Sequence, residues 1–432
     1  MDELGLTLIF LAVLFFFLGS GVWVAASLIG VATVGMLLFT TRPVGDAMAT
    51  TIWGASSSWT LTALPLFIWM GEILFRTKLS ENLFKGLTPL LGRLPGGLLH
   101  VNIAGCTIFA AISGSSAATV ATVGKMSIPE LRQRNYPEKM IIGTLAGAGT
   151  LGLLIPPSIT LIIYGVTVNE SIAQLFIAGI IPGLMLAALF MGYVAVWGLF
   201  FAKTDDQTDK ILPGQFKDVL QLIPILLLIT GVMGSIYAGV ATATEAAVLG
   251  VVGALLLSGM QRSLTKKSFV DALMGATRTS AMIAFILAGS TFLSLTMGFT
   301  GLPRTLAEWI GGLSLSPWML IFALMIFYII LGCFLDGISS VVLTMAVIEP
   351  LVRQAGFDMV WFGIFLMVVV EMAQITPPVG FNLFVLQGMT GKDMAFIARA
   401  AAPMFLLMVL AVIILAVFPQ IATYLPEVMS GR

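Results

Sequence analysis

The sequence contains very little charge. Of its 432 residues only 10% are charged, against roughly 25% in a typical soluble protein, and acids and bases cancel to a net charge of zero. So little polar surface excludes a soluble globular protein of this size, and the absence of a positive excess gives no indication of nucleic-acid binding. One histidine and two separated cysteines, Cys106 and Cys333, exclude a disulfide framework and a transition-metal cluster.

Hydrophobic residues make up 59% of the chain, and the mean hydropathy is +1.06. The apolar runs are of helix-crossing length, about 17–25 residues, and lack the alternation of a membrane β-barrel. The sequence therefore predicts an all-α polytopic membrane protein. The first run, residues 4–18, follows an acidic start rather than the positive start of a signal peptide, so we expect a retained helix.

Two adjacent prolines interrupt two of these runs. Pro156-Pro157 lies in GTLGLLIPPS, Pro377-Pro378 lies in QITPPVGFNLF, and the two pairs are 221 positions apart. At the same offset PELRQRNY (129–136) falls on PLVRQAGF (350–357). We therefore predict two repeats, residues 1–211 and 212–432, joined by the polar stretch 203–217, and such repeats are typical of transporters.

The distribution of basic residues predicts how the repeats are oriented. In the first half, segments 76–93 and 125–139 carry an excess of basic residues: Arg76, Lys78, Lys85, Arg93, Lys125, Arg132, Arg134 and Lys139. In the matching segments of the second half the charges balance, because Arg304 is accompanied by Glu308, and Arg353 by Glu349 and Asp358. Because Lys- and Arg-rich loops stay in the cytoplasm, the first pair of segments is cytoplasmic and the second external. The halves are then inverted copies with both termini periplasmic.

This orientation requires a re-entrant hairpin in each half. The apolar segment at about 98–128 must return both its ends to the cytoplasm, with SGSSAAT (113–119) at its tip, and its counterpart at about 318–348 carries CFLDGISS (333–340). Five crossings per half remain, near 4–18, 20–39, 56–75, 138–165 and 172–201, with their shifted copies. An amphipathic stretch before the third crossing, 263–278 in the second half, is expected to lie on the bilayer as a separate helix.

The proline pairs fall inside the crossings at about 138–165 and 359–388, each directly after a hairpin. Proline removes a donor and frees carbonyls, which a membrane tolerates only where the backbone faces protein or a watery cavity. With inverted repeats, both tips and both breaks meet near the midplane, where free carbonyls and half-helix ends bind ions and anionic groups. The alternative is that the prolines only kink the helices.

Four motifs together resemble the large membrane subunit of the TRAP (tripartite ATP-independent periplasmic) transporters: SGSSAAT, GTLGLLIPPS, ATATEAAVLG (241–250) and QITPPVGFNLF. The resemblance extends over essentially the whole chain. It implies a sodium-driven importer of organic acids, of the sialic acid or C4-dicarboxylate type, that works by an elevator motion in a bacterial inner membrane. It also implies two partners, a small four-helix membrane subunit, expected as a separate chain, and a periplasmic substrate-binding protein.

Six side chains are expected to face the substrate: Ser115, Ser116, Ser158, Thr160, Asp336 and Asn382. Asp336 is the most informative, because an intramembrane carboxylate is by default a functional hypothesis. The competing interpretations are a structural cap for Asp336 and close packing for the tip serines. For Glu371 and Glu245, a structural pairing competes with a transport role. Glu72 and Arg76 are one helical turn apart and are expected to form an interfacial ion pair.

Sodium is a hard cation that prefers oxygen ligands. The first candidate site comprises Ser113, Gly147, Thr150 and Pro156, and the second comprises Gly337, Ser339, Thr376 and Pro377. A stand-alone sodium-coupled carboxylate carrier of a related inverted-repeat fold, and a channel, remain alternative functions. An enzyme is not expected, because the sequence offers no nucleophile–base or metal constellation.

Overall fold

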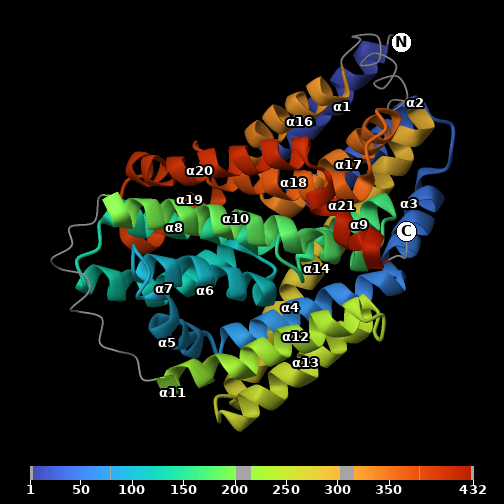
Figure 1. Ribbon diagram of the computed structural model, residues 1–432. Coiled ribbons are helices and arrows are strands. Elements are labelled where there is room, and N and C mark those ends of the chain that lie inside the picture. The colour runs from blue at the N-terminus through green and yellow to red at the C-terminus, as the bar shows by residue number, and fades with distance from the viewer. Residues whose placement is uncertain (1–2, 78, 201–215, 302–315, 379, 430–432) are drawn as a thin grey trace.

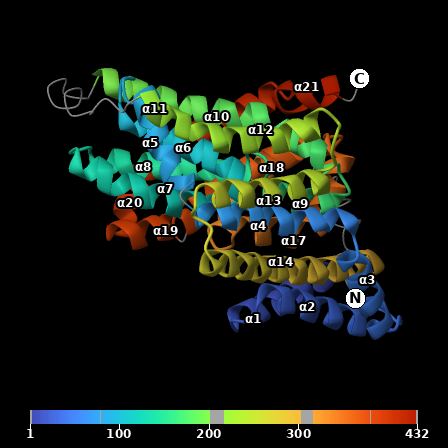
Figure 2. The same cartoon turned by 90° about the horizontal axis from the view of Figure 1, so that it is seen from below.

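The computed structural model describes residues 3–77, 79–200, 216–301, 316–378 and 380–429, and every regular element in these ranges is a helix. The helices run roughly along one direction in stacked layers (Figures 1 and 2). Five helices in the described ranges are long and apolar enough to cross a membrane, or six if one bent pair counts as a span. The prediction of an all-α polytopic membrane protein is confirmed. Most of the polar joint, and Arg304 with Glu308, lie outside the described residues.

The first half of the chain contains these elements: α1 (Glu3–Gly19), α2 (Val24–Phe39), α3 (Val44–Ser56), η1 (Trp59–Thr62), α4 (Ala63–Phe75), α5 (Leu79–Leu91), α6 (Leu98–Ser113), α7 (Ser116–Gln133), α8 (Glu138–Gly149), η2 (Thr150–Leu153), α9 (Ile159–Val168) and α10 (Ile172–Phe200). The hairpin predicted near 98–128 is the pair α6 and α7. The broken helix predicted near 138–165 is α8, η2 and α9.

The second half contains α11 (Phe216–Val219), η3 (Leu220–Leu222), α12 (Ile223–Tyr237), α13 (Ala243–Met260), α14 (Lys266–Thr300), α16 (Pro317–Gly332), α17 (Gly337–Gln354), α18 (Met359–Gln374), α19 (Phe381–Thr390), α20 (Met394–Val417) and α21 (Gln420–Met429). The second hairpin corresponds to α16 and α17, and the second broken helix to α18 and α19.

The third crossing differs between the halves. In the first half α3 is a separate helix, and the segment formed by η1 and α4 bends away from it by 55°. In the second half the amphipathic stretch is the start of the 35-residue helix α14, so the prediction of a separate surface helix is wrong there. Its capping box, Thr265 with Ser268, starts the helix, and no proline interrupts it before Gly301. At 1.5 Å per residue α14 is about 52 Å long, which exceeds the ~30 Å hydrocarbon core.

The two broken helices run in opposite directions. Arg132 pairs with Glu138 at the start of α8 (Nε–Oε1 2.7 Å) and also donates to the carbonyl of Thr390, the last residue of α19 (3.4 Å). At the other end, the hydroxyl of Tyr164 in α9 donates to the carbonyl of Met359, the first residue of α18 (2.7 Å). The start of each broken helix therefore lies beside the end of the other.

Helices from the two halves pack directly on each other at the centre of the molecule. Every residue of α18 is buried, as are most residues of α8. Glycines allow the close approach: a Cβ on Gly143 of α8 would lie 2.4 Å from the carbonyl oxygen of Ala400 in α20, and one on Gly147 would meet Met404. Small residues serve the same purpose at membrane helix interfaces generally. The first parts of the two broken helices, α8 and α18, thus lie in the buried core.

Candidate functional site

The first break lies between Gly149 and Ile159. The hydroxyl of Thr150 donates to the carbonyl of Gly147 (2.5 Å), which tightens the chain into η2, and the cis Pro156–Pro157 bond follows. Ser158 then starts α9 by accepting a hydrogen bond from the Leu161 N–H (3.3 Å) while its hydroxyl donates to the Leu153 carbonyl (2.6 Å). Ser158 is fully buried, so its oxygen holds the break in shape.

The second break lies between Gln374 and Phe381 and also contains a cis peptide bond, Pro377–Pro378. The hydroxyl of Thr376 donates to the carbonyl of Met372 (2.7 Å). Both prolines of this break are exposed, whereas Pro156 and Pro157 are buried. The two breaks are therefore unequally accessible: the second opens to the molecular surface and the first is enclosed.

The tip of the first hairpin lies against the first break. Gly114 turns the chain in the left-handed region (φ 57°), and a Cβ there would come within 3.1 Å of the Pro157 carbonyl oxygen. A Cβ on Gly152 would lie 2.5 Å from the backbone nitrogen of Ser116. Glycine is required at both positions, because backbone meets backbone with no room for a side chain.

The hydroxyls of this tip are engaged locally. Ser115 is the N-cap of α7 and accepts a hydrogen bond from the Ala118 N–H (3.4 Å). Ser113 exchanges a hydrogen bond with the Thr119 hydroxyl (2.8 Å), and Thr119 also donates to the Ser115 carbonyl (2.8 Å). The tip is thus a closed network of oxygen atoms whose remaining lone pairs are available to a cation.

The tip of the second hairpin is joined to the second break by three hydrogen bonds. The Gly380 N–H donates to the Cys333 carbonyl (3.3 Å), and the Gln374 side chain donates to the Leu335 carbonyl (3.2 Å). The Cys333 thiol donates weakly to the Pro377 carbonyl (3.5 Å). The second tip is therefore hydrogen-bonded to the break of its own half, and the first tip packs closely against its own break.

Asp336 occupies the N-cap of α17. One carboxylate oxygen accepts from the backbone N–H groups of Ile338 (3.1 Å) and Ser339 (3.4 Å). The side chain is only partly buried, and Gly337 and Ser339 beside it are buried. The capping interaction anticipated as the alternative is present, and it leaves the second carboxylate oxygen for other partners.

A single carboxylate links the two halves of the site. The Leu153 N–H of the first break donates to Oε1 of Glu371 in α18 (3.2 Å), and Glu371 is only 1% exposed. The Ser116 side chain also interacts with this carboxylate. Through Glu371, the first break and the first tip contact the helix that leads into the second break. Sequence analysis identified Glu371 but neither this partner nor the Gln374 link.

Several buried polar atoms around the breaks have no hydrogen-bond partner among the described residues. They are Thr160 Oγ1, Ser340 Oγ, Glu371 Oε2, and both amide atoms of Asn382. Thr160 and Asn382 are fully buried in the first turns of α9 and α19, directly after the two breaks. A buried polar group without a partner is costly, so each such group requires an explanation, such as a bound ion or water.

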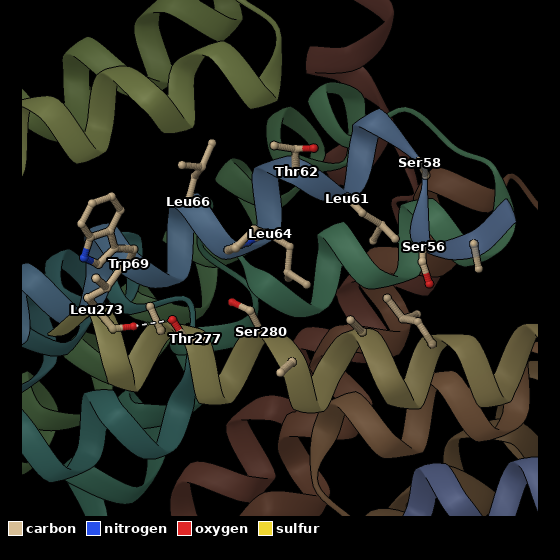
Figure 3. Close-up of a pocket in the computed structure, with 16 residues that line it drawn as sticks. Ser56, Ser58, Leu61, Thr62, Leu64, Leu66, Trp69, Leu273, Thr277 and Ser280 are labelled. Atoms are coloured by element: carbon tan, nitrogen blue, oxygen red, sulfur yellow. Dashed lines mark hydrogen bonds between the residues drawn. The ribbon is translucent and has the colours of Figure 1, made fainter. Parts of the chain in front are cut away.

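A separate cavity of about 510 Å³ lies where the bent pair of α3 and α4 packs on the straight α14 (Figure 3). Leu64 and Trp69 line it from α4, and Leu273, Thr277 and Ser280 from α14. It contains none of the predicted site residues. Its lining residues come from the two third crossings, whose difference the sequence did not predict.

Two expected side-chain pairings are clear in the structure. Glu72 and Arg76 form the ion pair predicted from their spacing (2.9 Å), so that prediction is confirmed. Glu245 forms a capping box with Thr242 at the start of α13, with its Oε2 accepting from the Thr242 N–H (2.8 Å). Glu245 is exposed.

Comparison with known proteins decides the family. Residues 11–421 match the model of the "Tripartite ATP-independent periplasmic transporter, DctM component". The chain belongs to the TRAP transporter large permease family. The resemblance seen in the sequence motifs is thereby confirmed, and the permease is not an enzyme, as predicted.

Three relatives of the TRAP permease carry different substrate names. It is 32% identical to the C4-dicarboxylate TRAP transporter large permease protein DctM of Pseudomonas aeruginosa over 91% of this chain and 92% of that one. It is 31% identical to the isethionate TRAP transporter permease protein DctMQ of Oleidesulfovibrio alaskensis, over 94% and 64%. It is 29% identical to the sialic acid TRAP transporter large permease protein SiaM of Vibrio cholerae, over 95% and 96%.

A solved structure shares the fold. The YdaH transporter of Alcanivorax borkumensis superimposes with a TM-score of 0.61 over 95% of the TRAP permease and 97% of YdaH, at 13% identity. At that identity the likeness concerns architecture alone. The TRAP permease is a multi-pass membrane protein and one component of a tripartite system.

Proposed function

We propose that this TRAP permease is the sodium-coupled importer subunit for an organic acid anion in the bacterial inner membrane. A periplasmic binding protein delivers the anion, and a small four-helix membrane subunit completes the complex. The relatives named for C4-dicarboxylate, isethionate and sialic acid all handle organic anions, which supports this substrate class. The specific acid is left open, because the relatives differ at comparable identity.

One observation carries the proposal. Two oppositely directed broken helices meet in the buried core, and buried oxygen atoms beside their breaks have no hydrogen-bond partner in the part of the chain that the structure describes. Broken helices of this kind bind ions and carboxylates in secondary transporters, because half-helix ends and free carbonyls are aimed at the midplane. Their opposite directions also support the prediction that residues 1–211 and 212–432 are inverted repeats.

Sodium fits the donors available at both breaks. Hydroxyl, amide, carboxylate and carbonyl oxygens form the set that hard cations prefer, and sodium does not favour the soft sulfur atoms of Cys333 and Met408, which also lie beside the breaks. Ser113, Gly147, Thr150 and Pro156 would hold one ion and Gly337, Ser339, Thr376 and Pro377 another. Bound sodium supplies positive charge that attracts the substrate anion.

The residues of the chain shape the substrate site around these ions. Ser115 and Asp336 cap α7 and α17 and thereby fix both tips, with Ser116, Ser158 and Thr160 placed beside the first break. Asn382, whose amide has no partner in the described structure, is placed to bind the substrate beside the second break. The exposed prolines of that break lie on its open side. We infer that both hairpins and both broken helices move together as an elevator.

Reconstitution tests the proposal. The permease with its two partners in liposomes should take up the acid only when a sodium gradient is present. Uptake at the same rate without a sodium gradient would contradict sodium coupling. Uptake by the permease without its partners would favour the stand-alone carrier. Flux at channel rates without a gradient would favour a channel.

A further inference from the structure

Arg132 of the first half caps a helix of the second half. It lies in the last turn of α7, and its guanidinium donates to the carbonyl of Thr390, the last residue of α19 (3.4 Å). Gly391 follows in the left-handed conformation (φ 68°), which ends α19 and leaves this carbonyl outside the helix. Glu138 holds the guanidinium from the other side (2.7 Å). A basic group at a helix C-terminus satisfies an orphan carbonyl and the negative end of the helix dipole.

Arg353 makes the reciprocal contact. It lies 221 positions after Arg132, in the last turn of α17, and donates to the carbonyl of Val168, the last residue of α9 (3.0 Å). Asn169 follows in the left-handed conformation (φ 57°), as Gly391 does in the other half. Glu349 and Glu170 hold this guanidinium at 2.9 and 3.2 Å. Each hairpin is thus attached to the far end of the other half's broken helix.

These arginines lie too far from the tips to bind substrate there. Arg132 is sixteen residues from Ser116 along one helix, which is about 24 Å, and Arg353 is equally far from Gly337. Their side chains are 38% and 45% exposed, and exposed ion pairs of this kind add little to stability. Neither direct substrate binding nor overall stability accounts for two such contacts at equivalent positions.

We propose that Arg132 and Arg353 are reciprocal braces that keep both hairpins and both broken helices one rigid body throughout transport. The proposal rests on the proposed function, since it concerns how that body moves. The second tip is hydrogen-bonded to the break of its own half, and the first tip packs against its own break. Each arginine joins the other end of its hairpin helix to the opposite half. With a brace removed, α7 or α17 moves separately from its neighbours, and sodium passes without substrate.

Sodium leak tests the braces. Arg132→Gln and Arg353→Gln should each raise substrate-free entry of radioactive sodium into liposomes by at least about threefold and lower coupled uptake, and Arg132→Lys should restore part of the coupling because lysine also caps a helix C-terminus. Arg76→Gln is the matched control, because it removes a similar exposed ion pair within one helix. An unchanged sodium leak in both glutamine variants, or an equal leak in Arg76→Gln, would contradict the proposed role of Arg132 and Arg353.

Cross-linking tests whether the braced ends stay together. Arg132→Cys and Thr390→Cys, introduced into a chain with Cys106→Ala and Cys333→Ala, can be bridged by a short bis-methanethiosulfonate reagent. Bridged protein should retain the uptake of its reduced form. A loss of uptake that reduction reverses would show that these ends separate during the cycle, and the proposal would fail. Uptake at the wild-type rate that does not depend on sodium would instead contradict sodium coupling, which belongs to the proposed function. In that case the cross-linking result would still decide whether the braced ends separate.

Discussion

The backbone N–H of Leu153, in the first broken helix, donates to Oε1 of Glu371 in the second, at 3.2 Å. This bond joins residues that are 218 positions apart in the chain and lies among fully buried neighbours. It is a direct polar link between the first break and the helix that leads into the second break. Any movement that separates the breaks must first break it.

Glu371→Ala should destabilise the permease by roughly 3 kcal/mol, because it leaves the Leu153 N–H unsatisfied and opens a cavity. Glu371→Gln keeps an acceptor in place and should cost less than about 1 kcal/mol. Unfolding can be followed with a thiol-reactive dye, since Cys106 is fully buried until the protein opens. Equal losses in the two variants would contradict the assigned hydrogen bond.

Asp336→Asn separates the charge of Asp336 from its capping interaction. Asparagine caps helices about as well as aspartate, so the unfolding temperature should not change. Sodium-dependent uptake should fall by about tenfold, the equivalent of ~1.4 kcal/mol, if the negative charge organises the ion site.

Asp336→Ala is the comparison for that experiment, because it removes both the cap and the charge. It should lower uptake and also cost about 1 kcal/mol of stability. Full uptake by Asp336→Asn would show that Asp336 serves only as a cap.

Gly152→Ala should separate the first tip from the first break. The added methyl group would lie 2.5 Å from the Ser116 nitrogen and 2.6 Å from the Ser115 carbonyl carbon, both backbone atoms that cannot rotate away. Such overpacking costs about 1–3 kcal/mol, and uptake should be lost with it.

Gly192→Ala is the matched control for the glycine substitution. Gly192 lies inside α10 with nothing within 4 Å of the added methyl group. Alanine favours helix by up to about 1 kcal/mol, so stability should hold or rise and uptake should persist. Wild-type behaviour of Gly152→Ala would mean that the tip and the break are not tightly joined.

Asn382→Leu should lower transport without lowering the stability of the permease. The amide of Asn382 is fully buried and has no hydrogen-bond partner among the described residues, so its replacement by an apolar side chain of similar size should leave the unfolding temperature unchanged or higher. Uptake should be strongly reduced, because the proposed function assigns this amide to substrate binding. Normal uptake would show that Asn382 does not bind the substrate. Severe destabilisation would indicate that its amide has a structural partner.

The sequence alone determined the class of the protein and the places where its helices break. Hydropathy and charge are local properties, so they predict membrane helices reliably. Two adjacent prolines remove two backbone donors in succession, so the breaks at Pro156 and Pro377 were also predictable, whereas single prolines such as Pro182 and Pro403 lie inside the continuous helices α10 and α20. Spacing alone predicted the Glu72–Arg76 pair, because its partners lie one turn apart.

Only the tertiary structure decided which elements touch. The partners that Glu371, Arg132 and Arg353 have in the other half of the chain lie 183 to 258 positions away, and nothing local to these residues specifies them. The continuity of α14 was also missed, because an amphipathic start followed by an apolar run fits one long helix as well as two short ones. Such contacts follow from how whole helices pack, with glycines such as Gly152 setting how closely, and that packing is a property of the assembled fold.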